Sequence, residues 1–569
     1  MVSNKARALF GFVLYYVATL ALGSILAYSA NAIGSRLKGP VIFNLNAFIF
    51  EALALTLLAV IAFKSFSRVL AFSMLYTALI YKVIAPYFVF NGHVNYDSPV
   101  HYLSALYLRD HGITYGYHYH SWPHAPILVD MFNSVTAFIY PADASIIAVA
   151  SRALIPLFVY LGSKQISQNT ELSFLALAIL LVFEPFILHY SPQIVAVTLL
   201  VMFIYILVFK KLESNASFLL ALLASISLFL SHAMMPLFAT LFVISLIVVQ
   251  LWILKGDVPF YKNSKAMYRT VVLAVILLLI ALAYNISITV FVTRSIIRTI
   301  QLILTSGEAR LDVYSVIIDI PELAWQYETI KWLSRIAIVI LLGIPSATEA
   351  FRIAVKALRR NLASDEFSEL LVILACVLGI ATFVVGNIIL SLGLFERYYQ
   401  IAIILAPIVA IKCMDHTKSK HKVVFNLKKV FIVFVAIFIF ISIFVTSSYT
   451  TIFADSFSER EVYLSSWVSK YTTNNVLYLD GAGRLNQLIL LMIYPRFVYP
   501  FNVSLGDNIA RMTYTVPEGS LITIRPFAIL ATRVSGVRLS ELSEFISSLS
   551  FHVDISLVYS DGICLVYTS

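Results

Sequence analysis

A polar stretch at residues 91–126 concentrates the side chains best suited to catalysis or ligand binding. Its last two-thirds hold five of the eleven histidines of the chain, mixed with aromatic and acidic residues: His101, His111, His118, His120 and His124. Apolar runs long enough to cross a bilayer lie on both sides of it. Polar side chains are costly inside a membrane, so we expect this stretch to face water and to carry a function.

Asp97 and His101 lie at the start of a predicted short helix within this stretch. Ser98 followed by Pro99 is typical of a helix N-terminus, and Gly112 is typical of a helix end. The four-residue spacing places the carboxylate and the imidazole on one face of the first turn, close enough to act together on a proton. Two alternatives stay open: Asp97 as a helix cap, and His101 as a surface imidazole without a role.

Three further histidines, His118, His120 and His124, surround Trp122 and Pro123. Their nitrogens are suitable zinc ligands, but their spacing matches no standard zinc pattern. An interfacial loop with stacking aromatic rings is the simpler interpretation. We therefore assign no cofactor from the sequence and keep a divalent metal ion as an alternative.

The composition is typical of a protein that crosses a membrane many times. The chain has 569 residues, is 60% hydrophobic and 12% charged, and has a mean hydropathy of +0.90. Apolar runs predict 13 α-helical spans. These fall at residues 8–32, 41–63, 67–90, 146–163, 172–190, 193–209, 217–231, 236–254, 270–292, 333–351, 369–393, 397–412 and 430–449.

Basic residues predict the orientation of these spans. With the N-terminus in the cytoplasm, the short inner segments hold 21 lysines and arginines and the outer ones seven. The positive-inside rule therefore favours a cytoplasmic N-terminus and an outer C-terminus. The formal net charge of +10 is explained by this bias and by attraction to anionic membrane lipids, so we exclude nucleic acid as a partner.

In this orientation the transmembrane domain covers residues 1–449 and carries outer loops at 91–145 and 293–332. Residues 450–569 form a predicted extracytoplasmic α/β domain. It begins with a helix-like segment from Glu459 to Tyr471. Strand-like runs follow at 476–479 (VLYL), 521–524 (LITI) and in a hairpin around Asp561–Gly562.

The predicted topology brings further polar residues to the level of the 91–126 stretch. Glu184 lies in the outer half of a span, and His189 and His232 lie in outer turns. Glu396 and Arg397 begin a span on the same side. Acids inside a membrane are candidates for function by default.

Simpler roles are also open for the charged members of this set. Glu184 has Arg152 as a candidate ion-pair partner, and Arg397 has Glu396. Arg397 is also placed to extend its charged group to the membrane surface.

Five short motifs resemble the type C glycosyltransferase superfamily, whose members move a sugar from a polyprenyl- or dolichyl-phosphate carrier on the outer membrane face. The motifs are YDSPVHYLSALYLRDHG at 96–112, YHYHSWP at 117–123, HYSPQ at 189–193, LSHAMMP at 230–236 and FERYYQ at 395–400. The nearest likeness is to poorly characterised archaeal membrane proteins with a similar Asp-x-x-x-His loop. Thirteen spans and a small outer C-terminal domain resemble the same superfamily.

The resemblance implies a role for each candidate residue. Asp97 would be the general base that activates the acceptor hydroxyl, and the sugar would leave its phosphate with inversion. Arg397 would bind the phosphate, and His101 would orient the base. The resemblance places the other candidates at the substrate: Glu184, His189, His232, Glu396, Tyr398 and Trp122.

The chain also departs from the better-described members. Its acidic loop follows the third predicted span instead of the first, and it has neither a WWDYG motif nor a DxD motif. Metal dependence is therefore not implied. The acceptor stays open between a glycan, a protein and a lipid.

Rival interpretations are a transporter or flippase, a polysaccharide polymerase or ligase that handles lipid-linked glycans, and a non-catalytic outer-surface assembly protein that binds through residues 450–569.

Overall fold

The computed structural model describes a discontinuous set of residues, most of them helical. These are 53, 55–62, 67–89, 142–182, 192–210, 212–232, 235–254, 265–280, 340, 342–359, 361–385, 396–417, 436–437, 463–464, 466–467, 470, 476–479, 521–524, 556–560 and 565–568.

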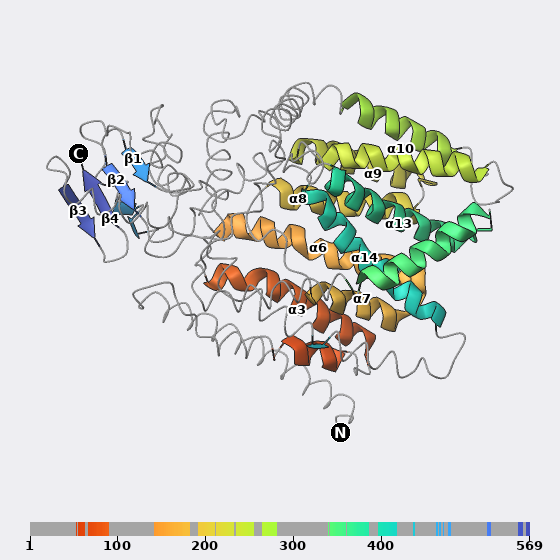
Figure 1. Cartoon of the computed structure of the whole chain (residues 1–569), viewed down its shortest axis with the longest axis horizontal. Helices are drawn as coiled ribbons and strands as arrows, with labels where there is room; N and C mark the ends of the chain where they lie inside the picture. The colour runs from red at the N-terminus through yellow and green to blue at the C-terminus, as the bar shows by residue number, and fades with distance from the viewer. Residues whose placement is uncertain are drawn as a thin grey trace, which may run out of the picture.

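The helices lie side by side in a bundle (Figure 1). They are α3 (Arg68–Val89), α6 (Ala142–Ser167), α7 (Thr170–Val182), α8 (Pro192–Tyr205) with its π-helical extension η1 (Ile206–Lys210), α9 (Asn215–Ser231), α10 (Met235–Leu254), α13 (Ser364–Phe383) and α14 (Glu396–Thr417). Residues 265–280 and 342–358 are also helical. Each of these helices falls on a predicted span, which confirms the positions of the helices but not the count of 13.

Three helices among the described residues are long and apolar enough to cross a membrane. They cover Gln193–Lys210, Met235–Trp252 and Glu366–Phe383. The described part of the chain is thus mainly helical, with three candidate membrane-spanning helices. The predicted spans at 8–32 and at most of 430–449 lie outside the described residues.

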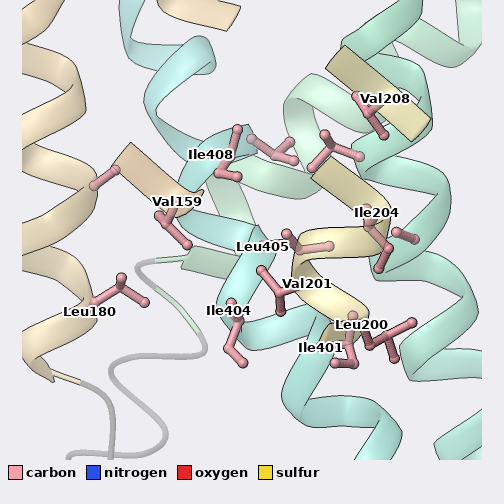
Figure 2. Packing of buried hydrophobic residues seen from close by; sticks show 14 of the residues in the cluster. Val159, Leu180, Leu200, Val201, Ile204, Val208, Ile401, Ile404, Leu405 and Ile408 are labelled. Carbon is pink, nitrogen blue, oxygen red and sulfur yellow. The ribbon is translucent and has the colours of Figure 1, made fainter. Parts of the chain in front are cut away.

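Helix α14 lies at the centre of the packing. It packs against α13, α6 and α7, and Figure 2 shows buried side chains of α14 among those of α6, α7, α8 and η1. The buried residues labelled there are Val159, Leu180, Leu200, Val201, Ile204, Val208, Ile401, Ile404, Leu405 and Ile408. Lipid tails are as apolar as these side chains, so close van der Waals packing is what favours helix contact over lipid contact.

Helix α9 shows how the outer surface of the bundle is built. Leu219, Leu223 and Ile226 recur at helical spacing and are exposed, whereas Ala224 and Leu228 between them are buried. An apolar exposed face opposite a small-residue buried face is typical of a helix that touches lipid on one side and protein on the other.

A four-stranded sheet lies apart from the bundle (Figure 1). Its strands are β1 (Val476–Leu479), β2 (Leu521–Ile524), β3 (Ser556–Ser560) and β4 (Leu565–Thr568), in the order β1-β2-β4-β3. β1 and β2 are parallel, and β4 is antiparallel to both β2 and β3. The predicted strands are confirmed, as is the antiparallel pairing of the two strands on either side of the predicted turn. The turn itself, at Asp561–Gly562, lies outside the described residues. Membership of the strands in a separate outer α/β domain stays a prediction.

Candidate functional site

Helix ends gather on two sides of the bundle. On one side, which we call the Tyr398 end, α9 ends, and α10 and α14 begin. On the other side, which we call the Lys412 end, α6 and α14 end and α13 begins. The positive-inside rule predicts that the Tyr398 end faces outward.

Tyr398 anchors the first turn of α14. Its side chain is fully buried, and its ring lies 5.2 Å from that of Phe238, centroid to centroid, in a tilted arrangement. Phe238 belongs to the first turn of α10. The ring contact therefore joins the starts of two helices that are far apart in sequence.

A glycine on α13 allows this arrangement. A Cβ atom at Gly379 would lie 2.7 Å from the carbonyl oxygen of Tyr398 and 3.3 Å from the backbone nitrogen of Ala402. Nearly a turn away on α13, the thiol of Cys376 donates a hydrogen bond to the Ala402 carbonyl at 3.7 Å. Small residues permit such close backbone approach between membrane helices. The position of Tyr398 is thus set by backbone contact as well as by its own ring.

His232 ends α9 on the same side of the bundle. Its backbone is extended, and its N–H donates to the carbonyl of Leu228 at 3.0 Å. The preceding residue, Ser231, donates its hydroxyl to the Ser227 carbonyl at 2.6 Å. His232 as a whole is buried. This confirms the prediction that Ser231 and His232 form the end of this span.

Two of the predicted site residues, His232 and Tyr398, lie at the same end of the bundle. Phe238, six residues after His232, contacts the Tyr398 ring. Glu396 and Arg397 are the first two residues of α14, so their backbones also lie at this end. Because the Tyr398 ring is wholly buried, it is better suited to positioning these neighbours than to touching a substrate.

Five predicted site residues lie outside the described part of the chain: Asp97, His101, Trp122, Glu184 and His189. The histidines proposed as zinc ligands also lie there. Among the described residues, no group of histidine, cysteine and acidic side chains is placed to hold a metal ion.

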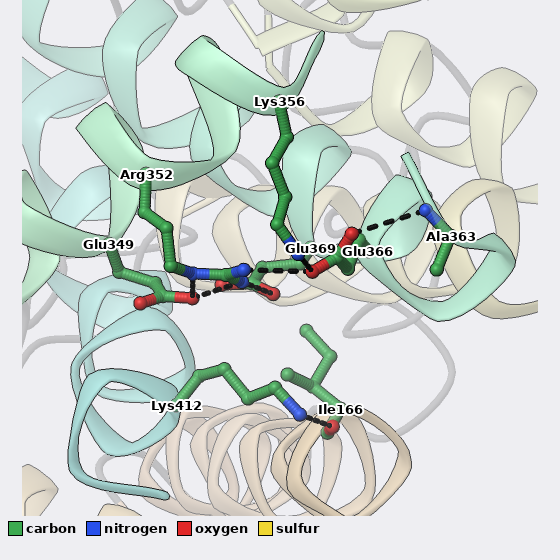
Figure 3. A network of polar contacts seen from close by, with 8 residues as sticks. All are labelled: Ile166, Glu349, Arg352, Lys356, Ala363, Glu366, Glu369 and Lys412. Carbon is green, nitrogen blue, oxygen red and sulfur yellow. Dashed lines mark hydrogen bonds and ion pairs between the residues drawn. The ribbon is translucent and has the colours of Figure 1, made fainter. Parts of the chain in front are cut away.

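At the Lys412 end the structure shows a buried charge network that the sequence analysis did not predict (Figure 3). Arg352 is its centre. Nε of Arg352 donates to Glu349 at 2.7 Å, Nη1 donates to Glu366 at 2.8 Å, and Nη2 reaches Glu369 at 3.4 Å. One guanidinium therefore joins residues 342–358 to the first turns of α13.

Both carboxylate oxygens of Glu366 have partners. Besides Arg352, it accepts from the ammonium of Lys356 at 2.5 Å and from the backbone N–H of Ala363 at 3.1 Å. The second of these contacts caps the start of α13. Its carboxylate is thus held by two cations and a helix N-terminus.

Lys412 adds two more helices, α14 and α6, to the residues around this network. Its ammonium lies on α14 and donates to the carbonyl of Ile166, near the end of α6, at 3.0 Å. The network has three acids (Glu349, Glu366 and Glu369) and three cations (Arg352, Lys356 and Lys412).

Burial and ion pairing act in opposite directions on Arg352. Burial alone would lower the pKa of its guanidinium, but the hydrogen bonds that it donates to Glu349 and Glu366 raise this pKa above its ordinary value. The central guanidinium is therefore held in its charged form.

A signal for this network was present in the sequence. Glu349 precedes Arg352 by three residues, and Glu366 precedes Glu369 by three, so each pair lies on one helix face. The orientation was predicted from lysines and arginines alone, and the residues after 351 were predicted to form a cytoplasmic loop. In the structure the helix runs on to residue 358, seven residues past the predicted span, because its charges have partners on α13.

No protein family model matches the chain, and no curated protein matches it. The likeness to type C glycosyltransferases thus depends on the short motifs alone.

Proposed function

We propose that the chain is a membrane glycosyltransferase of the type C superfamily. It would move a sugar from a polyprenyl- or dolichyl-phosphate carrier to a glycan, protein or lipid acceptor at the outer face of the cell membrane. The observation that best supports this is the convergence of two separate motifs. LSHAMMP contributes His232, FERYYQ contributes Tyr398, and both residues lie at one end of the bundle.

The proposed reaction needs one base and one cationic group. Asp97 removes the proton of the acceptor hydroxyl as its oxygen attacks the anomeric carbon. The bond from that carbon to the lipid phosphate breaks on the opposite side, which inverts the sugar. Arg397 binds the phosphate that leaves, since a guanidinium can donate two parallel hydrogen bonds to its oxygens.

The packing around Tyr398 supports the role proposed for Arg397, its neighbour in the first turn of α14. The Tyr398 ring is buried against Phe238, and the Tyr398 carbonyl faces Gly379. A backbone held in this way would let a phosphate group bound there lose little further entropy on reaction. Glu184, His189, His232, Glu396 and Trp122 complete the proposed sugar and phosphate contacts.

The proposal includes the topology. We infer 13 spans with a cytoplasmic N-terminus, and an outer domain at residues 450–569 that lies near the acceptor. Membrane lipids surround the apolar faces of helices such as α9. No metal ion is assigned to the reaction.

The decisive experiment is carrier turnover by the purified full-length protein in lipid vesicles. A panel of radiolabelled polyprenyl-phosphate sugars is supplied with a membrane extract as acceptor, and release of the free polyprenyl phosphate is measured. Asp97→Asn should abolish release, and the matched substitution Asp110→Asn in the same stretch should not. Normal turnover in Asp97→Asn, or no turnover of any carrier by the wild type, would overturn the proposal.

A transporter or flippase for lipid-linked glycans is the second candidate. Buried charged residues are frequent along the paths of transported ions, and the network around Arg352 is such a set. A transporter would move the labelled carrier across the vesicle membrane without cleaving it. Measuring cleavage and translocation in the same vesicles separates the two functions.

A further inference from the structure

The three acids of the Lys412 network are not equally compensated. Glu366 accepts from Arg352, Lys356 and the Ala363 N–H, and Glu349 accepts from two nitrogens of Arg352. Glu369 has one contact from Arg352, at 3.4 Å, and its Oε1 has no hydrogen-bond partner in the described part of the chain. Among these acids it is also the most deeply buried, with no exposed surface.

A carboxylate in this position is unfavourable as an anion. A buried ionised group needs both a close opposite charge and hydrogen bonds for its remaining lone pairs. The nearest guanidinium already serves two better-placed acids. Protonation removes the charge and replaces an unsatisfied oxygen with an O–H donor.

An acceptor for that donor lies beside it. Glu349 and Glu369 meet at the same nitrogen, because Nη2 of Arg352 lies 2.5 Å from Glu349 Oε1 and 3.4 Å from Glu369 Oε2 (Figure 3). Glu349 is held as an anion by two Arg352 nitrogens at 2.7 and 2.5 Å. Two adjacent carboxyl groups are stable when they share one proton and repel each other when both are ionised.

Among the described residues, ionisable groups face the pair from three elements. They are Arg352 in residues 342–358, Glu366 on α13, and Lys412 and Cys413 on α14. From α6 and η1 the polar contacts at this level are backbone carbonyls, those of Ile166 and Val208.

We propose that Glu369 and Glu349 form a buried proton-binding site at the Lys412 end, with the proton on Glu369 and donated to Glu349 at neutral pH. The proton comes from water, and no other bond is made or broken. The site is distinct from the proposed sugar-transfer site, and the inference does not depend on that function. The two sites share helices, because α13 carries Glu369 and Gly379 while α14 carries Lys412 and Tyr398.

Infrared spectroscopy of the purified full-length protein tests the site, because a protonated carboxyl group absorbs apart from a carboxylate. We expect the wild type at neutral pH to show a buried carboxyl band. Glu369→Gln should reduce the integrated intensity of this band by the amount that one carboxyl group contributes. Glu366→Gln is the matched control, because Glu366 lies one turn away and is held as an anion; it should leave the band unchanged. An unchanged band in Glu369→Gln would overturn the proposal.

A second measurement uses the wild type alone, so it does not depend on the folding of a variant. The band should disappear as the pH is raised, and it should persist when sodium replaces potassium at constant neutral pH. Loss of the band with sodium would identify a metal-cation site in place of a proton site and contradict the proposal. Absence of any carboxyl band at neutral pH would do the same.

Discussion

The two ends of the bundle are held together by different forces. At the Tyr398 end an aromatic ring, a glycine and a helix cap place backbones in close contact, with no ion pair among the contacts that we describe there. At the Lys412 end a set of acidic and basic side chains joins residues 342–358, α13, α14 and α6. Close backbone packing fixes the relative positions of the helices at the Tyr398 end. Buried ion pairs at the Lys412 end resist separation of the helices that carry them. We therefore expect the first end to govern activity and the second to govern stability.

Arg352→Ala should have the largest effect on stability and tests the contrast at the Lys412 end. It leaves three acids around an empty position, two of them almost fully buried, and should destabilise the protein by about 3–5 kcal/mol. Lys356→Ala removes a more exposed cation from the same network and should cost about 0.2–1 kcal/mol. Thermal unfolding in detergent measures both. Similar losses of stability in the two variants would show that burial of the cation does not determine how much it stabilises the Lys412 end.

Gly379→Ala tests the Tyr398 end with a smaller expected loss. The added methyl group meets a backbone carbonyl at 2.7 Å, which cannot move without displacing the first turn of α14. We expect a loss of about 1–3 kcal/mol and a larger effect on carrier turnover than Arg352→Ala shows among the molecules that remain folded. As a control, Val377→Ala changes an exposed residue of the same helix and should leave turnover unchanged.

The smallest effect is the coupling between Tyr398 and Phe238. A double-mutant cycle with Tyr398→Leu and Phe238→Leu should give an interaction energy of about 0.5–1.5 kcal/mol, as for other tilted aromatic pairs. Unfolding of the four proteins in detergent provides the cycle. If the losses of stability in the two single variants simply add up in the double variant, the ring contact does not hold the first turns of α10 and α14 together.

The same contrast explains what could be predicted from the sequence. Apolar runs predict where helices lie, and Pro192, His232 and Pro236 mark helix ends correctly, because these signals are local. The strands at 476–479 and 521–524 and the hairpin at Asp561–Gly562 were also local patterns. The charge network could not be predicted in this way, since Glu366 takes its partners from a different helix.

Gly379 shows the same limit at the other end. In the sequence it is one small residue in an apolar run, and only the packing of α13 on α14 reveals that a side chain there would meet the Tyr398 carbonyl. Conversely, Tyr398 was predicted to bind substrate because its motif lies beside Arg397. Its complete burial indicates a positioning role instead.

The strand order of the sheet has a consequence for the timing of folding. β4 comes last along the chain but lies between β2 and β3. β2 and β3 therefore have no direct pairing with each other, and the sheet cannot close until β4 has been synthesised. In the proposed topology it must also have been carried across the membrane. Until then β2 presents an unpaired edge, which gives chaperones on the far side of the membrane a defined period in which to bind.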